Sequence, residues 1–114
     1  MEFLLTLGLM IKLTENYIKE LKKTQTYKTY RDKLNALKKD EEMWNKVSEY
    51  RKKREELQNN TPSEELYDKA DWFEREHAYI YDNKQAKEFL EAEVALCRLV
   101  QDICFKLTQS LDFE

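Results

Sequence analysis

Apolar side chains recur along the chain at intervals of three, four and seven residues, which is the spacing of one face of an α-helix. The first such stripe holds Leu7, Met10, Tyr17 and Leu21 and predicts a helix from about Phe3 to Lys23. Similar stripes continue almost to the last residues. The pattern therefore predicts helix over most of the chain.

Short polar stretches separate these helical stripes. Residues 24–26, Thr-Gln-Thr, interrupt the first stripe, because threonine favours caps and turns over helix interiors. Asp40 is a candidate N-cap for a later segment. The pattern leaves open whether residues 38–40 end the preceding helix or only bend it.

The clearest predicted boundary lies at residues 59–64, Asn-Asn-Thr-Pro-Ser-Glu. We expect Thr61 to be the N-cap of the next helix, with Pro62 as its first helical residue. Glu64 then stands three residues after the cap, which completes a capping box. A second turn is predicted at residues 82–83, where asparagine tolerates left-handed backbone.

From Lys84 onward the helical pattern is unbroken for about 28 residues, which corresponds to about 40 Å of helix. A single small bundle does not bury an apolar face of that length, so we expect the excess to form an interface. The sequence predicts an all-α fold and a single helical domain over residues 1–114. We expect an antiparallel bundle of long helices, built of helical hairpins with coiled-coil-like packing, that forms oligomers.

Composition narrows the class of fold further. The 114 residues include one Gly and one Pro, far fewer than average usage would give. This scarcity argues against a β-sandwich, a barrel or a glycine-rich phosphate loop. The chain also has 2 Trp, 7 Tyr and 5 Phe, which argues against disorder because disordered segments are poor in aromatic residues.

The charge is small overall but uneven along the chain. The formal net charge is −3, so there is no overall basic footprint for nucleic acid. Residues 1–60 carry 14 Lys and Arg against 10 Asp and Glu, whereas residues 61–114 carry 6 against 13. We expect one half to pack on the other or on a second copy, with an electrostatic docking face for another protein as the alternative.

The most apolar stretch of the chain, residues 3–11, is too short to span a bilayer, which needs about 20 residues. It also follows Glu2 rather than a basic segment, unlike a signal peptide. We therefore predict no membrane span, with a membrane anchor as the alternative. The favoured interpretation is a helix face buried in an oligomer, with Leu7 and Ile11 as interface candidates.

Three segments carry motifs that resemble, in order, those of a known family. Residues 24–30 (TQTYKTY) resemble a Ser-x-x-Tyr-x-x-Tyr element, and residues 47–58 (VSEYRKKREELQ) resemble a segment in which an aromatic follows Glu. Residues 82–93 (DNKQAKEFLEAE) resemble the Asn-Pro-x-x-x-x-aromatic-Leu-x-Ala-Glu opening of a last helix. Over about residues 13–108 the chain is similar to the YlbF/YmcA/YheA family of small bacterial helical proteins.

The resemblance implies an all-helical, oligomerising fold without known catalytic activity. It further implies a regulatory partner in competence, sporulation and biofilm formation. Some members act as accessory factors for the membrane-bound endoribonuclease RNase Y, assembled with one another and carrying iron–sulfur clusters. The chain departs from the family pattern at Lys84, where the family has proline, and in residues 1–9, a candidate N-terminal extension.

Histidine and cysteine have a structural interpretation that we favour over a catalytic one. His77 is the only histidine and no nucleophile motif accompanies it, so we expect it in or beside the core. Cys97 and Cys104 share one face of the last helix, and we expect both to be buried as small apolar residues. The alternative is metal or iron–sulfur ligation, which needs about four thiolates and hence a dimer or a partner.

Glu93 is the one carboxylate on the otherwise apolar row Leu90, Cys97 and Val100. A buried carboxylate needs a partner, so we expect an ion pair with a cation from another helix. A general acid or a metal ligand is the alternative, although no second ligand stands beside it in sequence. The candidate cations are Arg31, Arg51 and Arg54.

Basic and aromatic residues also occur in patterns that could serve nucleic acid. The densest basic run, residues 51–54, is flanked by Glu49, Glu55 and Glu56, which is typical of a solvated helix face. Direct binding of RNA is the alternative. Aromatic residues at helical spacing are expected in the core, and these are Tyr27, Tyr30, Trp44, Tyr50, Trp72 and Phe73.

These observations and the resemblance together predict a non-enzymatic regulatory adaptor in the cytoplasm. We expect it to present a helical surface to a second copy of itself and to other regulatory proteins, or to the RNase Y machinery. No catalytic or cofactor-binding residue is predicted. The interface candidates are Leu7, Ile11, Leu90, Glu93, Cys97 and Val100.

Overall fold

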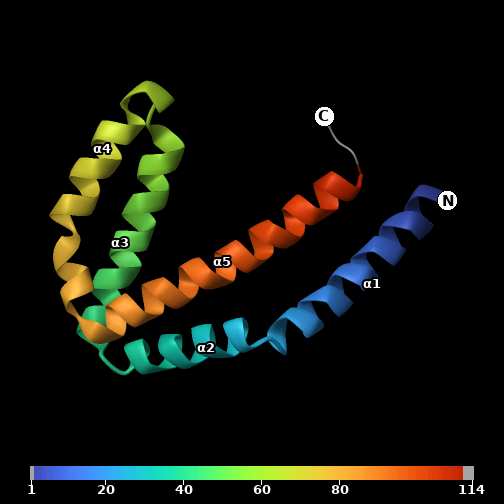
Figure 1. The fold of residues 1–114 in the computed structure, drawn as a ribbon, viewed down its shortest axis with the longest axis horizontal. Helices are drawn as coiled ribbons and strands as arrows, with labels where there is room; N and C mark the ends of the chain where they lie inside the picture. Colours follow the sequence, from blue (N-terminus) through green and yellow to red (C-terminus); the bar gives the residue numbers. More distant parts are fainter. Residues whose placement is uncertain (1, 112–114) are drawn as a thin grey trace.

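The computed structural model describes residues 2–111, which form helices joined by short connections (Figure 1). The elements in chain order are α1 (Glu2–Lys22), α2 (Gln25–Lys38), α3 (Glu41–Asn60), α4 (Ser63–Glu76), the 3-10 helix η1 (Ala78–Asp82) and α5 (Lys84–Ser110). Residues 2–111 contain no strand. The all-α prediction is confirmed.

Three helices begin at a residue whose side-chain oxygen accepts a hydrogen bond from the backbone N–H three positions later. These N-caps are Thr24 for α2, Asp40 for α3 and Asn83 for α5. Each bond satisfies one of the N–H groups that a helix start leaves without an intrahelical partner. Residues 38–40 therefore end α2 rather than bend it. Asn83 has φ −85°, so the second turn relies on this cap and not on left-handed backbone.

The boundary between α3 and α4 lies where the sequence predicts it, but the predicted capping box is wrong. Thr61 is the C-cap of α3, and Pro62 precedes α4 with ψ 142°, which is extended backbone. No side chain caps the start of α4. Because Pro62 is extended rather than helical, α4 begins one residue later, and the spacing from Thr61 to Glu64 no longer matches a capping box.

The helices form two arms that diverge from one corner (Figure 1). One arm is the hairpin of α3 and α4, which pack on each other. In the other arm α5 packs along α2 in the opposite direction, and α1 continues the line of α2 outward. Because the arms diverge, one copy does not show the predicted antiparallel bundle of all the helices, and the bundle and its oligomerisation stay predictions.

The core lies at this corner, where α2, α3 and the start of α5 meet. Its largest fully buried side chains are Tyr50, Phe89, Leu37, Ile80, Leu90 and Val47. Burying each large apolar side chain contributes about 1.5–3 kcal/mol to folding. Tyr30 and Trp44 cover Phe89 at centroid distances of 5.6 and 6.0 Å. Trp72, predicted for the core, is instead 63% exposed on α4, because its neighbour Phe73 occupies the buried face.

The outer parts of both long helices are left uncovered. α1 has no buried residue, and the buried residues of α5 all lie between Ala86 and Glu93. The radius of gyration is 18.1 Å, compared with about 13 Å for a compact chain of this length. None of the helices within residues 2–111 is both long and apolar enough to cross a membrane.

Candidate interaction surfaces

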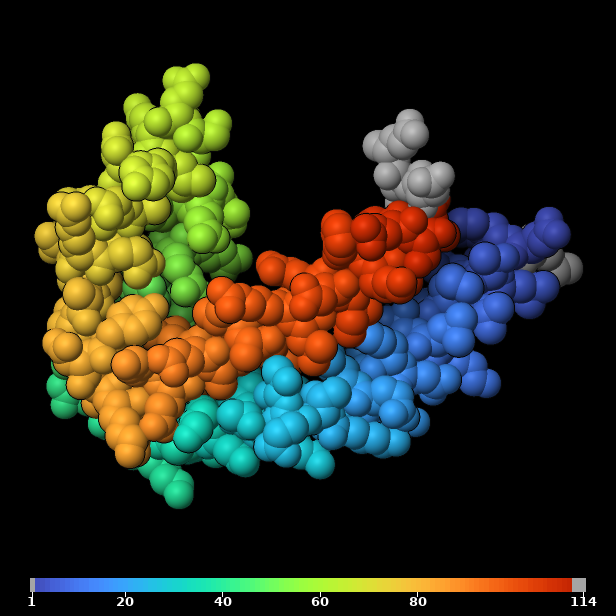
Figure 2. Space-filling view, viewed as in Figure 1, coloured from blue at the N-terminus to red at the C-terminus, as the bar shows by residue number. Residues whose placement is uncertain are grey.

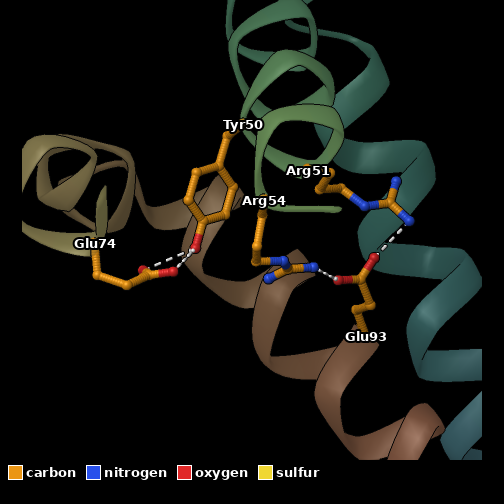
Figure 3. A network of polar contacts seen from close by, with 5 residues as sticks. All are labelled: Tyr50, Arg51, Arg54, Glu74 and Glu93. Carbon is orange, nitrogen blue, oxygen red and sulfur yellow. Dashed lines mark hydrogen bonds and ion pairs between the residues drawn. The ribbon is translucent and has the colours of Figure 1, made fainter. Parts of the chain in front are cut away.

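Glu93 joins α5 to α3 through two arginines at the corner (Figure 3). One of its oxygens lies 2.5 Å from Arg51 and the other accepts a hydrogen bond of 3.1 Å from Arg54. The guanidinium carbons lie 5.3 Å from the ring centroids of Phe89 and Tyr50 respectively. The predicted ion pair is confirmed for these two arginines, whereas Arg31 lies exposed on α2.

Tyr50 extends the same network towards α4 (Figure 3). Its hydroxyl donates to the carboxylate of Glu74, with oxygen distances of 2.8 and 2.9 Å. Burial, together with this contact, raises the pKa of Tyr50 far above its ordinary value, so the hydroxyl keeps its proton. Burial alone would lower the pKa of Arg54, but the hydrogen bond to Glu93 and the charge and hydrogen-bond contributions of Glu93 and Tyr50 together outweigh it, and the pKa is raised.

Some of the excess cations of the first half of the chain form ion pairs with carboxylates of the second half. In the part of the chain that the structure describes, each ion pair between different helices joins a cation of residues 1–60 to a carboxylate of residues 61–114. The third such pair is Lys33 with Glu88 at 3.0 Å, and this hydrogen bond lowers the pKa of Glu88. The prediction that one half packs on the other is confirmed at the corner.

His77 lies at the edge of the core, as predicted. It is the C-cap of α4, and its ring packs against that of Phe73 at a centroid distance of 4.2 Å, with the two planes tilted by 39°. Its Nδ1 lies 2.8 Å from the carbonyl oxygen of Phe73. α4 ends at Glu76, and the 3-10 helix η1 follows His77. The contacts of His77 with Phe73 therefore pack its ring against the core at the end of α4.

The two cysteines are exposed, which corrects the prediction that both are buried. Cys97 and Cys104 are free thiols on the part of α5 that extends beyond the corner. Their apolar neighbours on α5 have no helix of the same chain packed tightly over them, so the cysteines are not covered. No group of three or more His, Cys, Asp or Glu among residues 2–111 is placed to hold a metal ion.

An apolar groove of about 410 Å³ runs between α1 and the outer part of α5. From α1 it is lined by Met10, Leu13, Thr14 and Tyr17, and from α5 by Val100, Ile103, Cys104 and Leu107. Leu13 and Leu107 are both more than half exposed. Thr14 turns its hydroxyl to the carbonyl of Met10 at 2.8 Å, so the groove offers few free polar groups.

The predicted interface residues fall into two sets. Leu90 and Glu93 are 2% and 8% exposed and belong to the chain's own core, so they are not surface residues of a single copy. Both lie in the segment of α5 between Ala86 and Glu93, which α2 and α3 already cover. The other candidates remain available to a partner, and these are Leu7, Ile11, Cys97 and Val100.

Of the residues that line the groove, only Val100 is among the interface candidates that the sequence predicts. Met10 and Ile103 lie in the apolar stripes of the sequence, and helical spacing is enough to place each on an apolar face. The stripe alone does not tell which part of a long helix is covered by its own chain. That division depends on α2, whose 14 residues cover only part of the 27 residues of α5.

A scan against protein-family models matches residues 10–112 to the family described as "Control of competence regulator ComK, YlbF/YmcA". The search of the curated proteins found no match, and the search of the solved structures found none either. The family match spans nearly the whole chain and includes the corner, its ion pairs and the groove. This protein therefore belongs to the YlbF/YmcA family.

Proposed function

We propose that this chain is a non-enzymatic regulatory adaptor that acts through its helix surfaces, beginning with self-association. The observation that carries the proposal is the apolar groove between α1 and α5, which a second copy would cover. Membership of the YlbF/YmcA family supports a regulatory role. The polar residues at the corner form ion pairs and hydrogen bonds with one another and connect the two arms. These contacts favour a structural role for them over a catalytic one.

Self-association follows from the amount of apolar surface on α1. Ten large apolar side chains of this helix are more than a third exposed. These are Phe3, Leu4, Leu5, Leu7, Leu9, Met10, Ile11, Leu13, Tyr17 and Ile18. A stable interface buries about 800 Å² per partner, and the apolar side chains on one face of α1 would contribute to it together with the groove. A two-fold arrangement, in which the same surface meets itself, would satisfy both copies at once.

The biological role that we propose is control of competence through the regulator ComK, in a cytoplasmic setting. The description of the family names this role. Assembly with other family members and an accessory function for RNase Y rest on the sequence resemblance. An adaptor of this kind needs surfaces that bind proteins, and the exposed arms supply them.

An iron–sulfur cluster does not fit the thiolates of one chain. A cluster takes about four cysteine ligands, whereas the chain has two cysteines. Seven residues of helix separate Cys97 and Cys104 by about 10 Å. Both thiols are exposed on the same side of α5, so further chains would have to supply the remaining ligands.

Complementation in cells tests the proposal. The gene is deleted and replaced by the wild type, by Leu13→Lys with Leu107→Lys in the groove, or by Tyr67→Lys, an exposed change on α4. We expect the groove variant to resemble the deletion in transformation frequency and ComK level, because charged side chains oppose burial of the groove. Tyr67→Lys should restore both. Full restoration by the groove variant, at equal protein level, would contradict the proposal.

A further inference from the structure

The notch between the α3–α4 arm and α5 carries a second surface, separate from the apolar groove. Figure 2 shows it as the deep opening between the green and yellow arm and the orange helix. Two hollows of about 430 and 310 Å³ lie along it and share Arg54 and Gln58 in their lining. One wall comes from α3 and the other from α5, so a partner that enters the notch touches both arms.

Positive charge predominates in this notch, although the whole chain is acidic. Its lining has four cations and two carboxylates, Glu55 and Glu93. Glu93 already serves both Arg51 and Arg54, so that one negative charge is shared by two guanidinium groups. The other two cations, Lys52 and Arg98, are exposed and form no ion pair within residues 2–111.

The arginines of the notch are held in place before any partner arrives. Arg51 lies over the ring of Phe89 and Arg54 over that of Tyr50, while Glu93 fixes one end of each guanidinium. A guanidinium has five N–H donors. The remaining donors can bind carboxylates in paired hydrogen bonds without first losing side-chain freedom.

We propose that this notch is a docking site for an acidic helix of a partner protein. Carboxylates of the helix would meet Lys52, Arg98 and the free donors of Arg51 and Arg54, which are each about a third exposed. Its apolar face would meet Val94, which is 44% exposed on α5 beside Cys97. The charges of the notch and of such a helix are complementary, and this favours encounter and orientation.

The flank of the notch argues for a short acidic helix rather than a nucleic acid. α4 packs on α3 and has six carboxylates against one lysine and one arginine. The carboxylates are Glu64, Glu65, Asp68, Asp71, Glu74 and Glu76. A long polyanion would extend from the notch past this acidic arm and be repelled. A short helix need not extend past that arm.

Binding of defined peptides tests the proposal on the full chain. The probe is a fluorescein-labelled helical peptide of about five turns, with Leu on one face and Glu on the others. Its control has Gln in place of every Glu, and a second probe is a single-stranded oligonucleotide of similar length. The protein variants are Lys52→Glu with Arg98→Glu in the notch, and Lys12→Glu with Lys19→Glu on α1 as the matched control.

We expect the Glu peptide to bind the wild type and the Gln peptide to bind at least tenfold more weakly. The notch variant should lose at least tenfold in affinity for the Glu peptide, the α1 control should keep it, and added salt should weaken it. No binding of the Glu peptide, equal binding of both peptides, or an unaffected notch variant would overturn the proposal. Tighter binding of the oligonucleotide through the same residues would also overturn it.

This proposal rests on the proposed adaptor function, because it names the chemical character of a protein that the adaptor would bind. Its failure is distinguishable, because Lys52 and Arg98 lie outside the groove between α1 and α5. The notch variant should keep the molar mass of the wild type in light scattering. A groove variant should change the molar mass while it still binds the Glu peptide. A notch variant that loses self-association as well would overturn the separation of the two surfaces.

Discussion

At the scale of single residues, one carboxylate connects the two arms. Glu93 is 8% exposed and is held by Arg51 and Arg54, which come from the other side of the corner. Each arginine is about a third exposed, so water reduces the strength of the pair. Removal of Glu93 would still leave two cations close together beside buried aromatic rings.

Glu93→Ala should therefore destabilise the chain by about 1–3 kcal/mol, less than the loss of a fully buried pair because both arginines reach solvent. The measurement is urea unfolding followed by circular dichroism. Glu91→Ala is the control, since Glu91 is exposed on the same helix and its nearest cation, Lys87, is 4.0 Å away. A cost no larger than that of the control would show that the ion pair does not hold the corner.

The contacts and burial of individual side chains were partly predictable from the sequence. Glu93 stood out because a carboxylate on an apolar row needs a partner, and that argument led to the right arginines. The same row predicts buried cysteines, but both are exposed because no helix of the same chain packs tightly over α5 beyond the corner. The prediction that Trp72 lies in the core is wrong for a related reason, because helical spacing does not show whether another element covers an aromatic side chain.

At the scale of helices, polar caps decide where the elements begin. Asn83 starts α5 because its side-chain oxygen accepts a hydrogen bond of 2.9 Å from the backbone N–H of Ala86, a residue that is itself fully buried. Thr61 stands at a boundary that resembles a cap in sequence but makes no such bond. The sequence thus locates this helix boundary, but the capping box predicted at Thr61 does not form because the backbone of Pro62 is extended.

Asn83→Ala should cost about 1 kcal/mol of stability because it removes this cap. Thr61→Ala should cost far less, since its side chain caps no helix. The thermal midpoints of the two variants, measured side by side, check the difference. Equal losses in both variants would indicate that the capping box at residues 61–64 forms after all.

The helical pattern was predictable to within a residue or two at most ends, because periodicity is a local property. The division of α5 into a covered segment between Ala86 and Glu93 and an uncovered remainder was not, because it depends on the length of α2 and on the direction of the α3–α4 arm. The groove and the notch both arise from that division. Each is lined by residues from two helices, so the sequence of one segment does not predict it.

At the scale of the whole molecule, the open shape is the central feature. A single copy leaves α1 without any buried residue and exposes an apolar groove between α1 and α5. Apolar area of this extent is rare on soluble monomers and marks interaction sites. We therefore propose that the chain works as an assembly, with the groove as the surface between copies.

Molar mass from light scattering across a concentration series tests this claim most directly. The wild type should have the mass of a dimer or a larger oligomer, and Leu13→Lys with Leu107→Lys should shift it to 13.9 kDa, the mass of one chain. Tyr67→Lys should leave the oligomer intact. A wild-type protein that stays at the mass of one chain at high concentration would contradict the account.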